Sequence, residues 1–417
     1  MADFKRDLQY WKFSAYGFVK NLQFFDPFMV LFFREMGMSF LQIGVLYSVR
    51  EVITNLTEIP TGIVADSFGR RSAMVAAFAS YIVSFLLFYL FPSYGIYFIA
   101  MTAFALGESF RSGTHKAMIM EYLQRQGIAD QKISYYGHTR SWAQKGSAIS
   151  ALIAGGLVFF SGSYRSVFLW SIIPYVAGMF LIISYPKELD YSCEKDEECD
   201  DSAVKRGLAD AKKTVTGFIE LFKSGGVRRA LVNSSLFDAG FKTVKDYVQP
   251  VLRNLALTLP LAGMLAENQR IAVTSAAVYF CLYLLTSAAS SRSGRFFDLF
   301  STRRRGLNAT YLAGAAAVGL IGVGILAGLQ WLAVLLFVVY YLLENLRRPA
   351  TLEFLSDRIK GSVMATGLSG ESQMKTLLVA LLAPAFGWAA DSLGLGWALV
   401  LLALIPILAY PLLRFRK

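Results

Sequence analysis

The sequence predicts an all-α polytopic membrane protein with twelve transmembrane helices in two pseudo-symmetric six-helix bundles. Three observations support this fold class. Apolar runs near the length of a membrane span recur along the whole chain, basic residues gather on alternate connections, and polar positions of the first half recur in the second. Hydrophobic residues are 55% and charged residues 17% of the 417 residues. This composition is too apolar for two or three soluble domains.

The apolar runs place the helices in order along the chain. We expect them at residues 10–34, 41–65, 72–91, 95–120, 137–160, 165–185, 229–252, 271–290, 307–328, 330–350, 364–389 and 394–413. Short connections such as 92–95 allow only a turn between neighbouring spans. The expected helix at 307–328 is rich in glycine and alanine, which is typical of close helix packing. The predicted domains are a bundle at 1–185, a cytoplasmic linker at 186–228 and a second bundle at 229–417.

The linker is the one long connection between expected helices. It opens with an acidic segment around Cys193 and Cys199, which we expect to be solvated. Apolar residues then recur at spacings of three and four from Val204 to Phe222, with lysine and arginine at other positions. This pattern predicts an amphipathic helix on the inner membrane surface. The chain has only three cysteines, so no disulfide framework is indicated.

The formal net charge of +12 is explained by where the basic residues fall. They concentrate on alternate connections, and the main exceptions are Arg34, Arg165, Arg253 and Arg270. This positive-inside bias predicts that both termini are cytoplasmic, and nucleic acid is not needed as a partner. The first apolar run has full span length, so we expect no cleavable signal peptide. We expect a multi-pass protein of a bacterial-type inner membrane, without cofactors and monomeric.

One connection carries a specific motif, Gly62-Ile-Val-Ala-Asp66-Ser-Phe-Gly69-Arg70-Arg71. Gly62 lets a helix end pack closely against a neighbour, and Gly69 permits a tight reversal. Asp66 is placed to accept from a helix N-terminus or to pair with Arg70. Arg70 and Arg71 mark the cytoplasmic side. The alternative is a positive-inside turn without a special role.

This string resembles the G-x-x-x-D-x-x-G-R-R signature of the major facilitator superfamily, found there between the second and third spans. The resemblance implies a secondary transporter of twelve helices whose motif loop latches its two halves on the cytoplasmic side. It also implies that helices 1, 4, 7 and 10 line the cavity, while 3, 6 and 9 stay outside. A weaker copy, with a serine at the turn position, is expected to act as a second gating motif and comprises Gly294, Asp298, Arg303 and Arg304.

Polar residues inside the expected spans fall on stripes at helical spacing. Each buried charge costs ~2.5–3.5 kcal/mol on insertion scales, so such groups should face a cavity or a partner. The two halves match at one constant offset, with Glu108 and Arg111 corresponding to Glu344 and Arg347. Repeats of this kind place the substrate site near the membrane midplane. The predicted cavity residues are Lys20, Gln23, Asp26, Glu108, Arg111, Asp238, Lys242, Lys245, Asp246, Gln249, Tyr340, Glu344 and Arg347.

The roles of these charges remain open at this point. Glu108 with Arg111, Glu344 with Arg347, and Glu371 with Lys375 form either structural ion pairs or gates that open and close. The lysines favour a polar cavity over snorkelling to the membrane surface. A carboxylate in a partly apolar cavity can load and release a proton during transport. Asp26 is the first candidate for this role, and its rivals are Glu108, Asp238 and Asp246.

The sequence therefore predicts proton-coupled export of a small organic molecule by alternating access. Cations are frequent among the predicted cavity residues and aromatic residues lie nearby, which favours a substrate with anionic or amphipathic character. Uptake of an anionic nutrient by proton symport is the alternative, and a receptor or scaffold without transport is the alternative of another class. His115 and His138 are the only histidines, too few to indicate a metal site, and no catalytic motif is visible, so we expect no enzyme.

Overall fold

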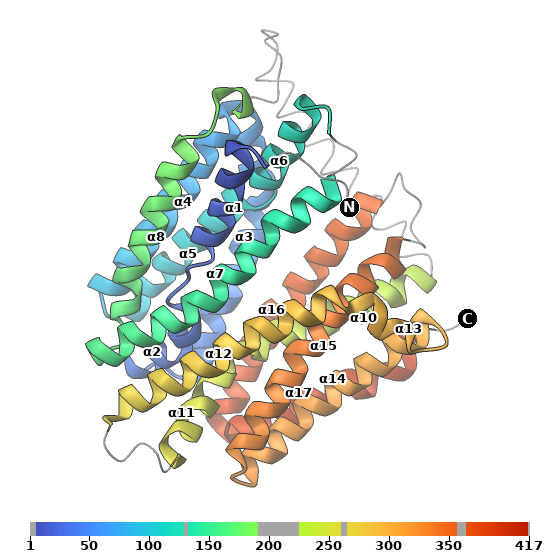
Figure 1. Ribbon diagram of the computed structural model, residues 1–417. Helices are drawn as coiled ribbons and strands as arrows, with labels where there is room; N and C mark the ends of the chain where they lie inside the picture. The colour runs from blue at the N-terminus through green and yellow to red at the C-terminus, as the bar shows by residue number, and fades with distance from the viewer. Residues whose placement is uncertain (1–5, 129–131, 191–224, 260–264, 357–363, 416–417) are drawn as a thin grey trace. The chain divides into compact units, whose positions relative to one another are not determined.

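The computed structural model describes residues 6–128, 132–190, 225–259, 265–356 and 364–415, and over these ranges it is helical without strands. The predicted fold class is confirmed, since each of the twelve expected spans contains helix (Figure 1). The amphipathic helix expected at 204–222 and the cysteines Cys193 and Cys199 lie outside the described residues.

The chain divides into two compact units by its contacts. The first comprises Met1–Pro27 and Val49–Asp210, and the second comprises Phe28–Ser48 and Ala211–Lys417. The end of expected helix 1 and the beginning of expected helix 2 therefore group with the C-terminal part of the chain. The division into 1–185, 186–228 and 229–417 stays a prediction.

The first unit, blue to green in Figure 1, is a bundle around an aromatic core. Phe85 and Tyr175 meet edge to face with ring centroids 4.9 Å apart, and Gly178 leaves space for Phe78. α4 packs against α5 and α8, and α1 packs against α7. The helices are α1 (Leu8–Lys20), α4 (Arg70–Leu90), α5 (Tyr94–Arg111), α6 (Thr114–Arg125), α7 (Lys132–Ser161) and α8 (Ser166–Ile183), followed by the turn η3 (Lys187–Leu189).

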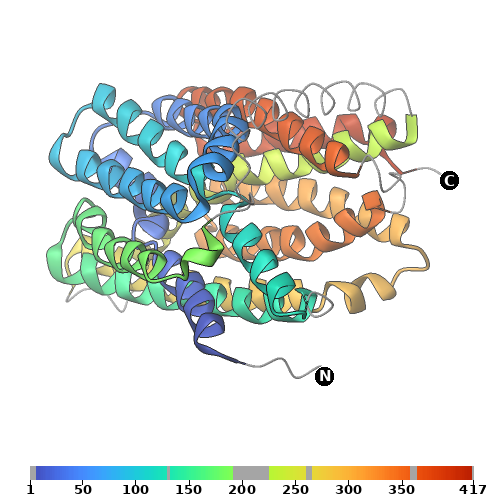
Figure 2. The ribbon, with the colours of Figure 1, turned by 90° about the horizontal axis from the view of Figure 1, so that it is seen from above.

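The second unit packs around a glycine-rich helix, as the sequence predicts. A Cβ atom at Gly322 would lie 2.5 Å from the carbonyl oxygen of Gly396, so only glycine permits this approach of α14 to α17. Figure 2 shows the α-helices of this unit that follow residue 225, yellow-green to red, running beside one another, whereas the short helix Met29–Glu35 is blue. They are α2 (Met29–Glu35), α10 (Gly225–Val244), α11 (Val248–Thr258), α12 (Glu267–Ser291), α13 (Ser293–Asp298), α14 (Arg303–Leu326), α15 (Gln330–Ser356), α16 (Met364–Leu393) and α17 (Leu395–Leu413), while α3 (Phe40–Phe68) passes from this unit into the first.

Three expected spans are interrupted where we expected continuous helices. Helix 1 breaks between α1 and α2, where the turn η1 (Asp26–Phe28) contains Pro27. Helix 4 breaks at Gly113, whose φ of 80° favours glycine. Helix 7 breaks at the turn η4 (Lys245–Tyr247), because Pro250 has no N–H to continue the helical hydrogen bonds. Each break lies beside predicted cavity residues, which is where interrupted backbone is tolerated in transporters.

Among the described residues, seven helices are long and apolar enough to cross a membrane. They correspond to expected helices 3, 5, 6, 8, 9, 11 and 12. The remaining five expected spans are interrupted or carry charges along their length, as α15 does with Glu344, Arg347, Arg348 and Glu353. The seven apolar segments are Arg70–Leu90, His138–Ser161, Ser166–Ile183, Glu267–Ser291, Arg303–Leu326, Ser369–Leu393 and Leu395–Leu413.

Candidate functional site

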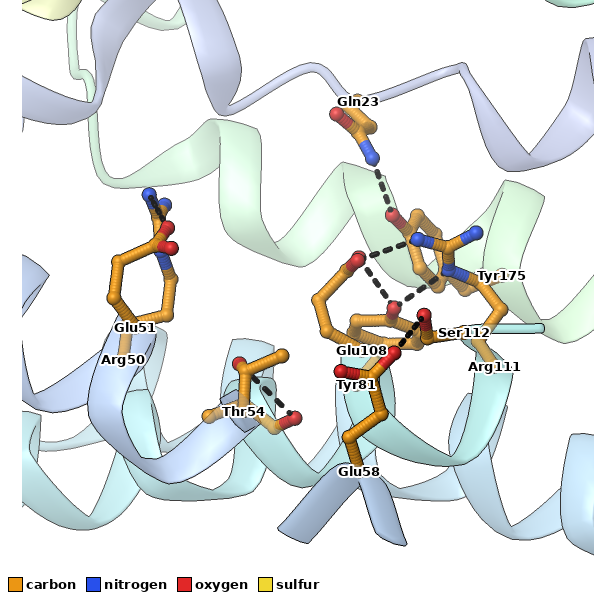
Figure 3. Close-up of polar contacts among 11 residues, drawn as sticks. Gln23, Arg50, Glu51, Thr54, Glu58, Tyr81, Glu108, Arg111, Ser112 and Tyr175 are labelled. Carbon is orange, nitrogen blue, oxygen red and sulfur yellow. Dashed lines mark hydrogen bonds and ion pairs between the residues drawn. The ribbon is translucent and has the colours of Figure 1, made fainter. Parts of the chain in front are cut away.

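A three-residue network joins α4 and α5 in the first unit. Arg111 Nη2 donates to Glu108 Oε2 at 2.5 Å, and its Nε donates to the hydroxyl of Tyr81 at 3.1 Å. The Tyr81 hydroxyl in turn donates to the other carboxylate oxygen of Glu108 at 2.5 Å (Figure 3). Glu108 and Arg111 therefore form an ion pair whose geometry is fixed by a tyrosine from a neighbouring helix.

The α1 residues predicted for the cavity lie near this network. Gln23 Nε2 donates to the Tyr175 hydroxyl at 3.3 Å (Figure 3). Lys20 is half-buried and within electrostatic reach of Arg111, Glu108 and Asp26. The structure thus brings Lys20, Gln23, Glu108 and Arg111 to one region of the first unit, with Asp26 at the turn that follows α1.

Arg347 has a different environment from Arg111, although the two were matched by the internal repeat. Its side chain is 1% exposed. One guanidinium nitrogen donates to the Leu307 carbonyl at 2.5 Å and the Thr310 hydroxyl at 3.1 Å, and the other donates to the side-chain oxygen of Asn233. The guanidinium also lies 4.7 Å from the ring centroid of Phe237. Neutral acceptors and an aromatic face, in place of Glu344, hold this arginine.

Glu344 is buried at 8% exposure, and its Oε2 atom has no hydrogen-bond partner. The charged groups that act on it come from three helices, with Asp238 on α10, Arg347 and Arg348 on α15, and Lys375 on α16. Glu371 accepts a hydrogen bond from the Ser234 hydroxyl. No ion pair joins Glu371 to Lys375 within the part of the chain that the structure describes. The pairs predicted for the second unit are therefore not formed in this structure.

Lys245 and Asp246, two of the predicted residues of helix 7, lie in its break. Lys245 Nζ donates to Asp246 Oδ1 at 2.7 Å, so these sequence neighbours form an ion pair. The Lys245 carbonyl accepts from the Tyr341 hydroxyl at 2.9 Å. Lys242 and Asp238 are half-buried on α10, and Tyr340 is buried beside Phe237.

Gln249 caps the N-terminus of another helix, α2. It is fully buried, and its side-chain oxygen accepts from the N–H groups of Val30 at 2.8 Å and Leu31 at 3.4 Å. These N–H groups belong to the first turn of α2, where no residue of α2 itself provides a side-chain cap. Gln249 therefore satisfies a helix N-terminus from more than 200 residues away along the chain.

The N-terminus of α3 is satisfied in the same way. Asp391 on α16 accepts from the N–H groups of Phe40 at 2.8 Å and Leu41 at 2.7 Å. Ser39 and Gln42 form a capping box, in which the Ser39 hydroxyl accepts from Gln42 N and the Gln42 side chain accepts from Ser39 N. Together these groups satisfy the first three N–H groups of α3.

The motif loop between α3 and α4 is held by residues at two other places in the first unit. Arg70 lies 3.4 Å from Asp66 but makes its shorter ion pair, at 2.5 Å, with Glu121 of α6. Gly69 has a φ of 100°, which permits the reversal before α4. Asp190 caps the N-terminus of α4. Its carboxylate accepts a hydrogen bond from Arg71 N at 2.8 Å, and its backbone carbonyl accepts one from Arg70 N at 2.9 Å.

The second copy of the motif repeats this arrangement. Arg303 lies 3.9 Å from Asp298 and makes a shorter ion pair, at 3.1 Å, with Glu353 of α15. In both copies the first arginine thus lies between the motif aspartate and an acid on another helix of the same unit. Arg304 follows Arg303 in the first turn of α14, and Gly294 lies in α13.

A family model described as Major Facilitator Superfamily matches residues 21–371 of this chain. The chain belongs to the major facilitator superfamily. A curated relative from Bacillus subtilis (strain 168), an uncharacterized MFS-type transporter called YxaM, is 31% identical over 90 residues. That match covers 22% of this chain and 23% of the relative, so it spans about a quarter of the relative's length.

Solved structures show the same fold over nearly the whole chain. The nucleoside transporter NupG aligns with a TM-score of 0.75 at 13% identity, covering 99% of this chain and 100% of its own. A D-xylose-proton symporter aligns with a TM-score of 0.67 at 13% identity, covering 97% and 96%. A peptide transporter determined with sulfate aligns with a TM-score of 0.67 at 13% identity, covering 97% and 94%. At these identities the likeness establishes the fold alone.

As a member of this superfamily, the chain is a multi-pass membrane protein. Two residues at its polar sites were missed by sequence reasoning. Tyr81 lies on a helix that we expected to stay outside the cavity, and Asp190 lies in the linker. A signal existed for Tyr81, because a tyrosine inside an apolar span needs a partner for its hydroxyl. Asp190 is one of several linker acids, and nothing local distinguishes it.

Proposed function

We propose that this superfamily member is a proton-coupled secondary transporter that moves a small organic molecule by alternating access. We propose that the direction of transport is export from the cell. The proposal of proton coupling is supported by the environment of Glu344, a buried carboxyl group with one oxygen that has no hydrogen bond. Burying a charged oxygen without a partner is costly, and binding a proton removes that cost. Glu344 is therefore suited to load and release a proton as its surroundings change.

The carboxylates predicted earlier divide by their surroundings. Glu108 and Asp246 are held in short ion pairs with Arg111 and Lys245, which favours a structural or gating role. Asp238 lies close enough to Glu344 to interact with it electrostatically, so it is a second candidate in the same unit. Asp26 remains a candidate because it follows a broken helix in the first unit. We therefore add Glu344 to the proton carriers and place it first.

The two motif loops fit the proposed cycle as latches. Each places an arginine between an exposed aspartate and an acid on another helix, and such pairs can be exchanged when helices move. We propose that Asp66 and Arg70, with their copy at Asp298 and Arg303, bias the balance between inward-open and outward-open states.

Inverted membrane vesicles with an imposed pH gradient test this function. For an exporter coupled to protons, labelled organic compounds accumulate inside inverted vesicles that are acidified inside, and collapse of the gradient stops accumulation. Asp66→Asn should lower the rate several-fold with normal protein levels, because the latch weakens while no apolar surface is exposed. Flux that ignores the gradient contradicts the coupling, and unchanged flux in Asp66→Asn contradicts the latch.

Proton symport in the uptake direction is the second candidate. It is favoured by one observation, the fold shared with a D-xylose-proton symporter. In the same vesicles a symporter carries substrate down the proton gradient, so the direction of accumulation separates the two. A receptor or scaffold without transport predicts no flux for any compound.

A further inference from the structure

A cavity of about 240 Å³ lies between α1, α6 and α7 in the first unit, beside the break at Gly113. Five lysine, arginine and histidine side chains line it, from four helices. They are Lys20 of α1, Arg111 at the end of α5, His115 and Lys116 of α6, and Arg140 of α7. No carboxylate lines this cavity among the described residues.

The nearby acids pair with Arg111 but leave the charges of Lys20 and Arg140 uncompensated. Glu108, which does not line the cavity, pairs with Arg111 through an N–H at one edge of the guanidinium. Asp26 acts on Lys20 only electrostatically, and no ion pair of Lys20 or Arg140 is found over the described ranges. A cleft lined by one sign of charge concentrates the opposite charge. The cavity therefore favours a ligand that carries negative charge.

A helix N-terminus at the cavity also favours a negatively charged ligand. α6 begins at Thr114, and its N-cap residue Gly113 has no side chain that could cap the first N–H groups. The N-terminus of a helix carries partial positive charge and unsatisfied donors, so it adds to the field of the cations. A carboxylate, phosphate or sulfonate group would be attracted by both.

One wall of the cavity is aromatic, which distinguishes an organic anion from an inorganic one. The ring of Tyr16 stacks on His115 with centroids 3.7 Å apart, and the edge of Phe13 meets the same imidazole. Both Phe13 and Tyr16 are buried, and Ile119 and Ala143 add apolar groups. Apolar lining with a few polar groups is the usual composition of a small-molecule site.

The walls of this cavity are fixed by close helix packing. A Cβ atom at Gly17 would lie 3.2 Å from the Thr139 carbonyl, and one at Gly146 would collide with the Phe18 carbonyl. α1 and α7 therefore approach at backbone distance at Gly17 and Phe18, in the last turn of α1 that carries Lys20. A preformed site of this kind loses less entropy when it binds a ligand.

We propose that this cavity is the anion-recognition site of the transported molecule, and that the molecule is a small organic acid with a planar or apolar body. The assignment rests on the proposed function, since it names the substrate class of that transporter. The acidic group would lie between Lys20, Arg140 and the N-terminus of α6. The apolar body would lie against Phe13 and Tyr16.

The test uses the full-length protein purified in detergent and a set of probes that share one ring. Benzoate and phenyl phosphate carry the acid, benzamide is neutral, benzylamine is cationic, and inorganic phosphate has no ring. We expect benzoate or phenyl phosphate to raise Tm in a saturable way, while benzamide, benzylamine and inorganic phosphate at equal concentration do not. Lys20→Gln and Arg140→Gln should each weaken the response about tenfold, because each removes a charge-assisted contact.

Lys12→Gln is the matched control. It lies on α1 as well, but its ammonium donates to the Ser184 carbonyl at 2.5 Å outside the cavity, so the response should equal that of the unmodified protein. Arg140 is exposed, so Arg140→Gln remains informative if Lys20→Gln fails to fold. The proposal is overturned if no ring acid raises Tm, if benzamide or inorganic phosphate acts equally well, or if Arg140→Gln responds normally.

Transport is scored separately from this binding. Proton-driven flux of neutral compounds together with absent acid binding would overturn the anion site and leave the transporter in place. Saturable acid binding that Arg140→Gln weakens, without flux in vesicles, would support the site and overturn the transport.

Discussion

At the residue scale, Arg347 shows how a buried charge can be held without a counter-ion at hydrogen-bond distance. Its donors meet Asn233, Thr310 and the carbonyl of Leu307, so the guanidinium ties α15 to α10 and α14. Charged groups that are fully hydrogen-bonded in this way stabilise a packed interior, whereas loss of one partner leaves polar atoms unsatisfied. These contacts favour a structural role for Arg347 in this unit, and its role in the cavity stays a prediction.

Arg347→Ala should therefore destabilise the protein strongly. It leaves the side-chain oxygen of Asn233 and the Thr310 hydroxyl without their donor. A hydrogen bond to a charged group contributes about 1.5–3 kcal/mol to the free energy of unfolding. Arg348→Ala is the matched control, since Arg348 is exposed on the next position of α15. Thermal unfolding in detergent should show a clear drop in Tm for Arg347→Ala only. Equal Tm values for the two variants would show that these contacts contribute little.

At the element scale, three helices begin at groups supplied from elsewhere in the chain. α2 depends on Gln249, α3 on Asp391, and α4 on Asp190. The first and second of these tie residues 28–48 to α11 and α16 within the second unit. Since the rest of α3 belongs to the first unit, any movement of the segment 28–48 away from α11 and α16 must release these caps.

Removing the cap of α3 should loosen this segment. Asp391→Ala leaves Phe40 and Leu41 N–H groups without an acceptor, whereas Asp391→Asn keeps one acceptor and serves as the control. Loss of a helix cap destabilises the helix end by about 0.5–2 kcal/mol. Labelling of a single cysteine introduced at Leu41 should therefore become several-fold faster in Asp391→Ala. The same labelling rate in Asp391→Ala, Asp391→Asn and the protein with Asp391 intact would contradict this role.

Much of the helix plan could be predicted from the sequence, because apolar length and positive-inside charge are local signals. The breaks at Pro27 and Pro250 were also visible as residues, although we expected continuous helices. The contacts of Gln249 and Arg347 could not be predicted. Spacing of three residues suggested that Arg347 pairs with Glu344, but the choice between that glutamate and Asn233 depends on how α10 packs beside α15. Such choices are made by tertiary structure, which a local pattern does not contain.

At the scale of the whole molecule, the two units use related sequences for different tasks. In the first unit Glu108 pairs with Arg111, and a cation-lined cavity lies beside them. In the second unit one carboxylate oxygen of the corresponding Glu344 has no hydrogen bond, while Arg347 donates its hydrogen bonds to neutral groups. This asymmetry suits a division in which the first unit binds the substrate and the second binds the proton.

Coupling in reconstituted vesicles tests this division most directly, with Glu344→Gln compared with Glu267→Gln, an exposed glutamate of the same unit. The substrate is the compound that gives the largest Tm shift. We predict that Glu344→Gln loses accumulation driven by a pH gradient by about tenfold or more, while exchange of labelled for unlabelled substrate at equal pH persists, because exchange needs no net proton movement. Glu267→Gln should behave as the unmodified protein. Full gradient-driven accumulation in Glu344→Gln would contradict the account.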